Sequence, residues 1–305
     1  MGVDGSSPSG STSYFPPFVI ISSMKFGIVF KKDKSFLRSS PAERGAGLKK
    51  ENNKAQEVAK SASSYLKSKG HDVYYEKDLG KADFILTFGG DGTLIHKACE
   101  LASQGVPLVG INTGNLGFLT TVESGDWKQA LDKLISGNYF ISERLSLDAT
   151  IGKGKEVYRA INEVVIKGLY RVVDLEIKIG GEKFLKVLGD GVIVATQTGS
   201  TAYSLSAGGP IVDPNLDSIL ITPINPIGLP IPSAVISPED DIEVNLIKGD
   251  DVSLVLDGQE HTRLSEGDRV KVKSGKYKIK FVYFDKHQFI KSLNAKFGLA
   301  SRAGG

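Results

Sequence analysis

The feature that most constrains this chain is the stretch Phe-Gly-Gly-Asp-Gly-Thr at residues 88–93, which directly follows an apolar run at 84–86. Closely spaced glycines let a strand turn sharply and expose backbone N–H groups, against which a polyphosphate can lie. Asp91 is the carboxylate in this loop, and it would repel a phosphate unless it took a proton from an attacking hydroxyl or held a metal ion. The stretch therefore indicates phosphoryl transfer. The alternative is a strand-to-helix turn that Asp91 caps.

A second motif lies between Gly189 and Pro210. The apolar run at 192–195 is typical of a buried strand, and it leads into a block of glycines and small hydroxyl residues with one aromatic residue, Tyr203. Such a block can pack against a flat ring and hydrogen-bond its edges. Asn162 and Glu163 precede three β-branched residues, and on their own they are either a polar turn at a strand entry or ligand contacts.

Together with the stretch Asn-Leu-Gly-Phe-Leu-Thr at 115–120 and the tail pattern at 289–298, these motifs resemble the NAD kinases, which phosphorylate NAD to NADP. The resemblance extends from about Met24 to Leu299. It implies a phosphotransferase that acts on an alcohol group. ATP or a related phosphate donor would be the co-substrate, and Mg²⁺ or another divalent cation the cofactor.

Two other classes compete with this interpretation. Diacylglycerol and sphingosine kinases, and more distantly phosphofructokinases, share a loop like Gly-Gly-Asp-Gly-Thr, so that loop alone does not choose among them. The block 199–210 favours the NAD kinases. A non-enzymatic dinucleotide-binding module would have no reason to keep a carboxylate facing phosphate.

The resemblance also implies roles for particular residues. Asp91 would accept the proton of the adenosine-ribose 2′-hydroxyl of NAD, next to the loop amides of Gly90 and Gly92. Five residues further on, His96 is either a cation near the phosphates or a surface histidine. The other expected contacts are Asn162 and Glu163 on the adenine or a ribose, Arg171 as a basic residue near the phosphates, Asp190 and Ala202 at the nicotinamide end, Thr201, Tyr203 and Ser206 on the adenine side, and Gln259 on the dinucleotide. The chain departs from the common bacterial pattern at Ile227, where a histidine is often found.

Composition narrows the classes of partner that the protein is expected to bind. A net charge of +3 from scattered lysines is too small for a nucleic-acid or membrane-binding surface. Cys99 is the single cysteine, which excludes an intramolecular disulfide and favours a cytoplasmic location. No Cys/His cluster has zinc spacing, and the four histidines are too dispersed to indicate a metal site. We therefore expect no nucleic acid or membrane partner. The resemblance implies that the protein forms a homo-oligomer, either a dimer or a tetramer.

The order of patterns predicts two domains. Strand and helix patterns alternate over 24–137, which favours an α/β domain with a doubly wound parallel sheet and ligands at the carboxyl ends of its strands. Short β-rich runs follow over 138–284, separated by turn signals such as Asp257–Gly258, and indicate a mainly β, NAD-binding domain. The last segment, 285–305, is expected to return to the first domain. The predicted elements are strands near 24–30, 71–75, 83–88 and 107–111, helices near 51–69, 93–103 and 127–135, β runs near 145–151, 156–166, 173–179, 191–196, 242–246, 253–256, 269–272 and 277–283, and a helix within 285–299.

Residues 1–23 are expected to form a flexible leader. The first thirteen are rich in glycine and serine, and the apolar patch at 14–21 is too short for a membrane span. We predict that deletion of residues 1–23 leaves the melting temperature and the kinase activity intact, because function begins at Met24. Loss of folding or of oligomer assembly on that deletion would instead identify 14–21 as a docked structural arm.

Overall fold

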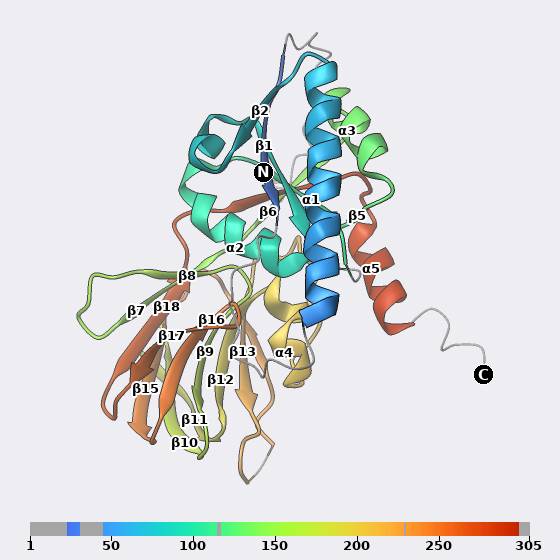
Figure 1. Ribbon diagram of the computed structural model, residues 1–305. Coiled ribbons are helices and arrows are strands. Elements are labelled where there is room, and N and C mark those ends of the chain that lie inside the picture. The colour runs from blue at the N-terminus through green and yellow to red at the C-terminus, as the bar shows by residue number, and fades with distance from the viewer. Residues whose placement is uncertain (1–22, 31–44, 115–116, 229, 299–305) are drawn as a thin grey trace, which may run out of the picture.

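The computed structural model describes residues 23–30, 45–114, 117–228 and 230–298, and they form two bodies, one above the other in Figure 1. The upper body holds a mainly parallel sheet with helices, and the lower body holds two antiparallel sheets. The fold class predicted from the sequence is therefore confirmed. The expected leader lies outside the described residues, except for residue 23.

A seven-stranded sheet organises the upper body. Its strands are β1 (Lys25–Phe30), β2 (Asp72–Tyr75), β3 (Phe84–Gly89), β4 (Leu108–Asn112), β5 (Val122–Glu123), β6 (Phe140–Arg144) and β19 (Ile279–Tyr283). The order is β2-β1-β3-β4-β19-β6, and β5 pairs with β4. Every pairing is parallel except that of β19 with β6. The carboxyl ends of β3 and β4 consequently meet at one edge, where the glycine loop begins.

Helices cover both faces of this sheet. Phe84, Leu86 and Phe88 of β3 pack in one core cluster with α1 (Gly45–Ser68) and α3 (Trp127–Ile135). Ile85 points the other way, into the cluster of α2 (Asp91–Leu101). Strands that are buried on both faces read as continuous apolar runs. This explains why the sequence of β3 shows no alternation of polar and apolar residues.

The lower body is a sandwich of two six-stranded sheets. One sheet, in the order β11-β10-β15-β18-β7-β8, consists of β7 (Leu147–Ile151), β8 (Tyr158–Ala160), β10 (Val173–Ile179), β11 (Glu182–Gly189), β15 (Ile242–Lys248) and β18 (Arg269–Ser274). The other, in the order β14-β13-β12-β9-β16-β17, consists of β9 (Glu163–Gly168), β12 (Gly191–Thr196), β13 (Ile219–Ile224), β14 (Ala234–Ile236), β16 (Val252–Leu256) and β17 (Gln259–Leu264).

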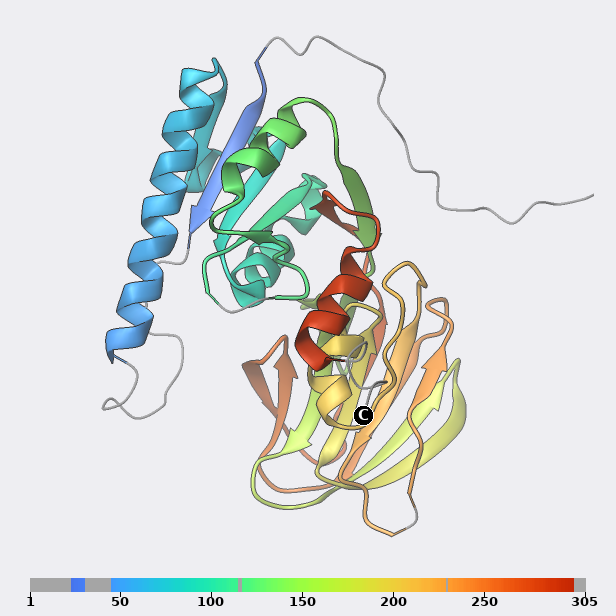
Figure 2. The same cartoon turned by 90° about the vertical axis from the view of Figure 1, so that its right-hand side faces the viewer.

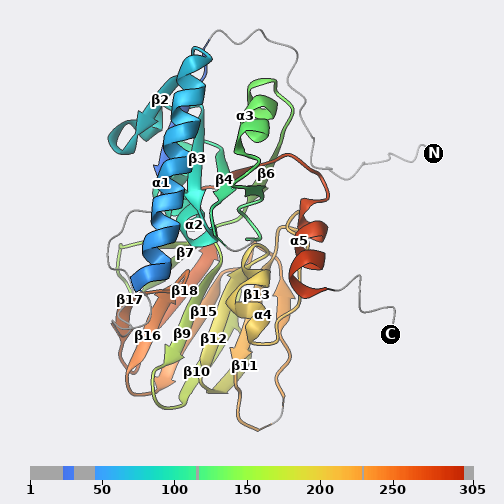
Figure 3. The same cartoon turned by 45° about the vertical axis from the view of Figure 1, so that its right-hand side comes forward.

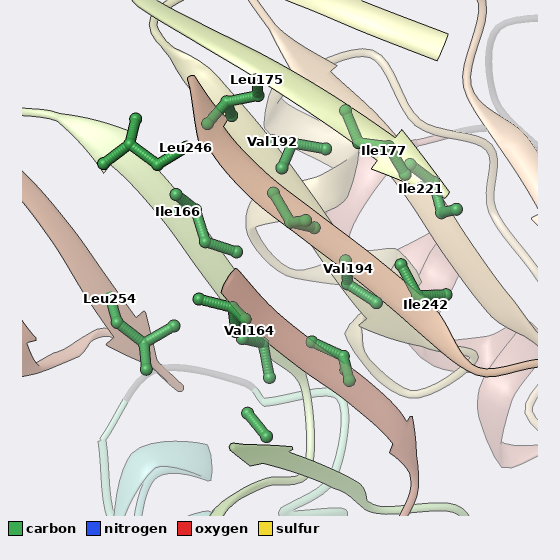
Figure 4. Packing of buried hydrophobic residues seen from close by; sticks show 14 of the residues in the cluster. Val164, Ile166, Leu175, Ile177, Val192, Val194, Ile221, Ile242, Leu246 and Leu254 are labelled. Atoms are coloured by element: carbon green, nitrogen blue, oxygen red, sulfur yellow. The ribbon is translucent and has the colours of Figure 1, made fainter. Parts of the chain in front are cut away.

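Alternation along β9 and β12 decides what each face of their sheet contacts. Val164 and Val192 point into the sandwich core, which Figure 4 shows between the two sheets. Val165 and Ile193 point to the outer face, where they pack with the half-buried Tyr203. The short helix α4 (Tyr203–Ser206) therefore lies on the outer face of this sheet, close to the upper body (Figures 1 and 3).

The observed strands differ from the expected ones at the boundary between the bodies. β6 and β19 fall in the range expected for the second domain, yet they extend the first sheet, because β19 pairs with β4 on one side and β6 on the other. The run expected at 156–166 divides into β8 and β9. After β19, helix α5 (Gln288–Phe297) descends beside α4 (Figures 2 and 3).

Candidate active site

The glycine loop joins strand β3 to helix α2 at the edge that faces the sandwich. Gly89 ends β3, Gly90 precedes the helix in extended conformation, and Asp91 is the first helical residue. A Cβ atom at Gly89 would lie 2.6 Å from Oγ1 of Thr93, so the turn requires glycine there. The first turn of a helix offers N–H groups without intrahelical partners at the positive end of the helix dipole. The loop is therefore suited to an anion.

Asp91 holds a second loop against this turn. Its Oδ1 accepts hydrogen bonds from the N–H of Thr120 at 2.8 Å, the N–H of Leu119 at 3.2 Å and Oγ1 of Thr120 at 2.8 Å. Its Oδ2 accepts the N–H of Phe118 at 2.6 Å. All four groups are donors, so the arrangement suits a carboxylate that only accepts. A Cβ atom at Gly117 would lie 2.0 Å from Oδ1 of Asp91, so the loop reaches the carboxylate only with glycine there.

Helix α5 supports the same loop from outside. The ring of Phe297 stands 6.0 Å from the ring of Phe118, and Nζ of Lys296 lies 4.1 Å from the Phe118 ring centroid. The C-terminal segment thus returns to the first domain and contacts a residue whose N–H binds Asp91.

Asn162 and Glu163 mark the entry of strand β9, at the end of the sandwich nearest α2. The carboxylate of Asp257 accepts the N–H groups of both residues, at 2.7 and 3.1 Å. On the other side, a Cβ atom at Gly199 would lie 2.1 Å from the carbonyl oxygen of Asn162. Glycine at 199 therefore lets the turn Gly199–Thr201 approach this pair, which joins two motifs about forty residues apart in the sequence.

The Glu163 carboxyl is buried, and its environment favours the neutral acid. Burial and the nearby Asp257 carboxylate raise the pKa of Glu163 to about 8, and the backbone N–H of Tyr203 opposes the shift. Within the described part of the chain, its Oε2 has no hydrogen-bond partner. A buried acceptor without a partner is costly, so this oxygen is available to a ligand hydroxyl.

The expected contacts between Thr201 and Ser206 follow the turn that approaches this pair. Thr201, Ala202 and Tyr203 are half-buried, and Ser206 is exposed at the end of α4. Nζ of Lys167 stands 5.8 Å from the centroid of the Tyr203 ring. Gln259 is exposed at the start of β17, two residues after Asp257.

Two expected residues are not brought to this place, and a third, His96, lies five residues after Asp91 on α2. Asp190 precedes β12, and Glu163 pairs with Ala195 near the other end of that strand, so about 17 Å of strand separates Asp190 from Glu163. Arg171 is exposed, and its guanidinium lies 3.7 Å from a carboxylate oxygen of Asp250. His96 is exposed on α2. Their assignment to the site stays a prediction.

The two clusters meet through helix α2. Cys99, on the last turns of α2, places its thiol 3.6 Å from Oδ2 of Asp257 and 3.8 Å from the carbonyl oxygen of Arg159. Burial, the first cause, and Asp257 raise the pKa of the Cys99 thiol, so it is a neutral packing group and not a nucleophile. Eight residues, or about 12 Å of helix, separate Asp91 from Cys99.

The described residues contain no group of three or more His, Cys, Asp or Glu side chains that could hold a metal ion. No helix among them is long and apolar enough to cross a membrane.

Comparison with known proteins decides the family. Residues 42–139 match the model of the ATP-NAD kinase N-terminal domain, and residues 161–284 match that of the C-terminal domain. This chain belongs to the NAD kinase family. It is 42% identical to the NAD kinase of Desulforamulus reducens over 227 residues, which are 72% of this chain and 79% of the relative. It is 39% identical to that of Natranaerobius thermophilus over 247 residues, or 76% and 86% of the two chains.

Solved structures agree with this family. The crystal structure of an NAD kinase from Archaeoglobus fulgidus in complex with ATP superimposes with a TM-score of 0.67, and the two sequences are 25% identical. The match covers 92% of this chain and 100% of that one. The yeast NADH kinase complexed with NADH is 24% identical, with a TM-score of 0.77 over 92% and 89%, and it shows the same fold.

The sequence did not reveal three parts of the candidate site. Asp257 gave only a turn signal next to Gly258, and nothing in its neighbours showed that its acceptors serve residues 161–163. The support of Phe118 by α5 also joins distant segments. Gly117 was noted within a motif, but its contact with Asp91 depends on the folded loop.

We predict that Gly117→Ala lowers kinase turnover by about 10²-fold, because the added methyl displaces the loop from Asp91 by roughly an ångström. Gly125→Ala is the matched control, since a Cβ atom there meets nothing within 4 Å. Steady-state kinetics and thermal melting of both variants measure the effect. Wild-type turnover in Gly117→Ala would show that the loop position does not matter for the chemistry.

Proposed function

We propose that Asp91 is the general base of the NAD kinase reaction in this chain. The adenosine-ribose 2′-hydroxyl of NAD gives its proton to Asp91, and its oxygen bonds to the γ-phosphorus of ATP. The bond from that phosphorus to the bridging oxygen breaks, and ADP leaves. Phosphoryl transfer depends mainly on positioning and charge neutralisation, so one aligned base and a donor-binding loop are sufficient machinery.

One observation carries this proposal: the carboxylate of Asp91 is fixed but not saturated. Three donors converge on Oδ1, whereas among the described residues Oδ2 accepts only the Phe118 N–H. A carboxylate oxygen has two lone pairs, so Oδ2 can take a further hydrogen bond from a substrate hydroxyl. A residue that served only as a helix cap would bond the N–H groups of its own helix, but Asp91 bonds a loop about 27 residues away.

The donor phosphates are assigned to the glycine loop and the N-terminus of α2. Gly90 and Gly92 place no side chain there, and a Cβ atom at either would meet nothing within 4 Å. Mg²⁺ usually binds through substrate phosphates and one or two carboxylates, which suits a chain whose described residues form no metal cage. When bound, it would neutralise developing phosphate charge, with Asp91 the carboxylate nearest the loop.

The dinucleotide is assigned to the second cluster. Oε2 of Glu163, which has no hydrogen-bond partner among the described residues, offers an acceptor to a ribose hydroxyl, and Asn162 is the preceding residue. Tyr203 adds a half-buried ring for stacking. Gln259 follows the Asp257 turn, at the rim of this cluster.

We predict that Asp91→Asn lowers turnover by about 10²–10⁴-fold, the usual contribution of a positioned base, with a smaller effect on NAD binding. Asp126→Asn is the matched control, because Asp126 also stands at a helix N-terminus of this domain but is exposed. Product formation from NAD and ATP, with calorimetry for NAD binding, separates the two effects. Near-normal turnover would leave Asp91 a structural residue. NAD binding by the wild type without NADP formation would favour a non-enzymatic module.

Asp190 and Arg171 suggest how a homo-oligomer would complete the site. Both are exposed at the end of the sandwich remote from α2. Two exposed apolar side chains belong to the same end: Tyr170, next to Arg171 in the chain, is 85% exposed, and Ile227, whose N–H binds the carbonyl oxygen of Leu188, is 57% exposed. Monomers rarely leave large apolar groups together on a surface. We infer that this end docks on a second copy and that Asp190 reaches the copy's dinucleotide.

A cytoplasmic location stays a prediction from the single cysteine.

Mixing two inactive variants tests this arrangement. If Asp190 serves the partner's site, Asp91→Asn mixed with Asp190→Ala regains up to about a quarter of wild-type activity, since half of the dimers are mixed and each holds one intact site. Each variant alone is the control. Activity of the mixture equal to the sum of the separate variants would place Asp190 outside the partner's site.

A further inference from the structure

Asp257 accepts the N–H groups of three consecutive residues. Its Oδ2 lies 2.8 Å from the nitrogen of Ile161, and its Oδ1 lies 2.7 Å from that of Asn162 and 3.1 Å from that of Glu163. In return, the N–H of Asp257 donates to the carbonyl oxygen of Glu163 at 3.1 Å. One side chain therefore fixes the backbone on which both expected dinucleotide contacts stand.

The turn between β16 and β17 explains why an aspartate is placed there. Asp257 and Gly258 have φ angles of 47° and 78°, the left-handed region that tight hairpin turns require and that Asp and Gly tolerate best. The pairing of β16 with β9 ends at Leu256 and Val164. The N–H groups before Val164 lie beyond that ladder, and the Asp257 carboxylate supplies the acceptors that a strand would otherwise provide.

The same carboxylate lies close to the buried Glu163 carboxyl. It is the second cause, after burial, of the raised pKa of Glu163. Other polar groups face the pair from neighbouring elements: the Cys99 thiol on α2, the Tyr203 N–H at α4, and Arg159 on β8, whose guanidinium is bound at 2.7 and 2.9 Å by Asp148 on β7.

We propose that Asp257 is a positioning residue for NAD binding, which holds the Asn162–Glu163 backbone in place and keeps a negative charge beside the Glu163 carboxyl. The inference rests on the proposed role of Glu163 as a ribose contact. An ionised Glu163 carboxylate accepts a hydrogen bond from a ribose hydroxyl more strongly than the neutral acid does, so binding of NAD strengthens as the pH rises through the range in which Glu163 titrates. Asp257 thereby affects both the geometry of the contact and its dependence on pH.

Two substitutions separate the two effects. In Asp257→Asn the amide nitrogen cannot accept an N–H, so we expect KM for NAD to rise about tenfold. Loss of the negative charge also lowers the pKa of Glu163, so the acid limb of the pH profile of kcat/KM for NAD moves to lower pH. In Asp257→Glu the charge stays while the oxygens shift by a methylene, so KM rises but the acid limb stays where it is. The matched control is Asp268→Asn, whose carboxylate accepts one local N–H, from Ser265, at 2.8 Å.

Kinetics over a range of pH, with calorimetric titration of NAD and thermal melting, provide the readouts. An unchanged KM in both Asp257 variants would overturn the inference, as would a lower kcat with wild-type KM and pH profile. If Asp257→Asn does not fold, Asp257→Glu still tests the positioning role. Glu163→Gln tests the underlying assignment: unchanged NAD affinity there removes Glu163 from the site, whereas weakened affinity there with unaffected Asp257 variants overturns only the present inference.

Discussion

Irregular backbone at the junction of the two bodies needs hydrogen-bond acceptors for its N–H groups, and the rest of the structure depends on how they are supplied. Loops that leave a sheet carry N–H groups with no strand to pair them, and burying such groups unpaired is costly. Two aspartates meet this need in the same way. Asp91 binds the N–H groups of residues 118–120, and Asp257 binds those of residues 161–163. Each thereby fixes one half of the site.

Helix α2 makes the two halves one unit. Asp91 begins the helix, and Cys99 near its end contacts Asp257, so a rigid rod of about 12 Å joins the carboxylates. The apolar side of this helix packs on the sheet through Leu94 and Ala98. The distance between the glycine loop and the cluster around Asp257 is therefore set by helix geometry and a packed core, not by a flexible linker.

Local signals in the sequence predicted the elements that depend on local chemistry. The apolar run of β3, the glycine loop and helix 127–135 lie where their own residues place them. The strands β6 and β19 were not assigned to the first sheet, because their pairing joins segments more than a hundred residues apart. Asp257 likewise gives only a turn signal in the sequence, since its N–H partners lie 94 to 96 residues away. A single sequence carries no signal for such distances.

The distribution of donors distinguishes the roles of the two aspartates. Asp257 shares its partners evenly, with two N–H groups on Oδ1 and an N–H and a thiol on Oδ2. Both oxygens are occupied, as a purely positioning carboxylate requires. Asp91 concentrates three donors on Oδ1 and leaves Oδ2 with one. Both oxygens hold the loop, but Oδ1 carries most of that support, so a lone pair of Oδ2 remains for a substrate hydroxyl. The proposed base can therefore also be a scaffold, because holding the loop does not use all of its lone pairs.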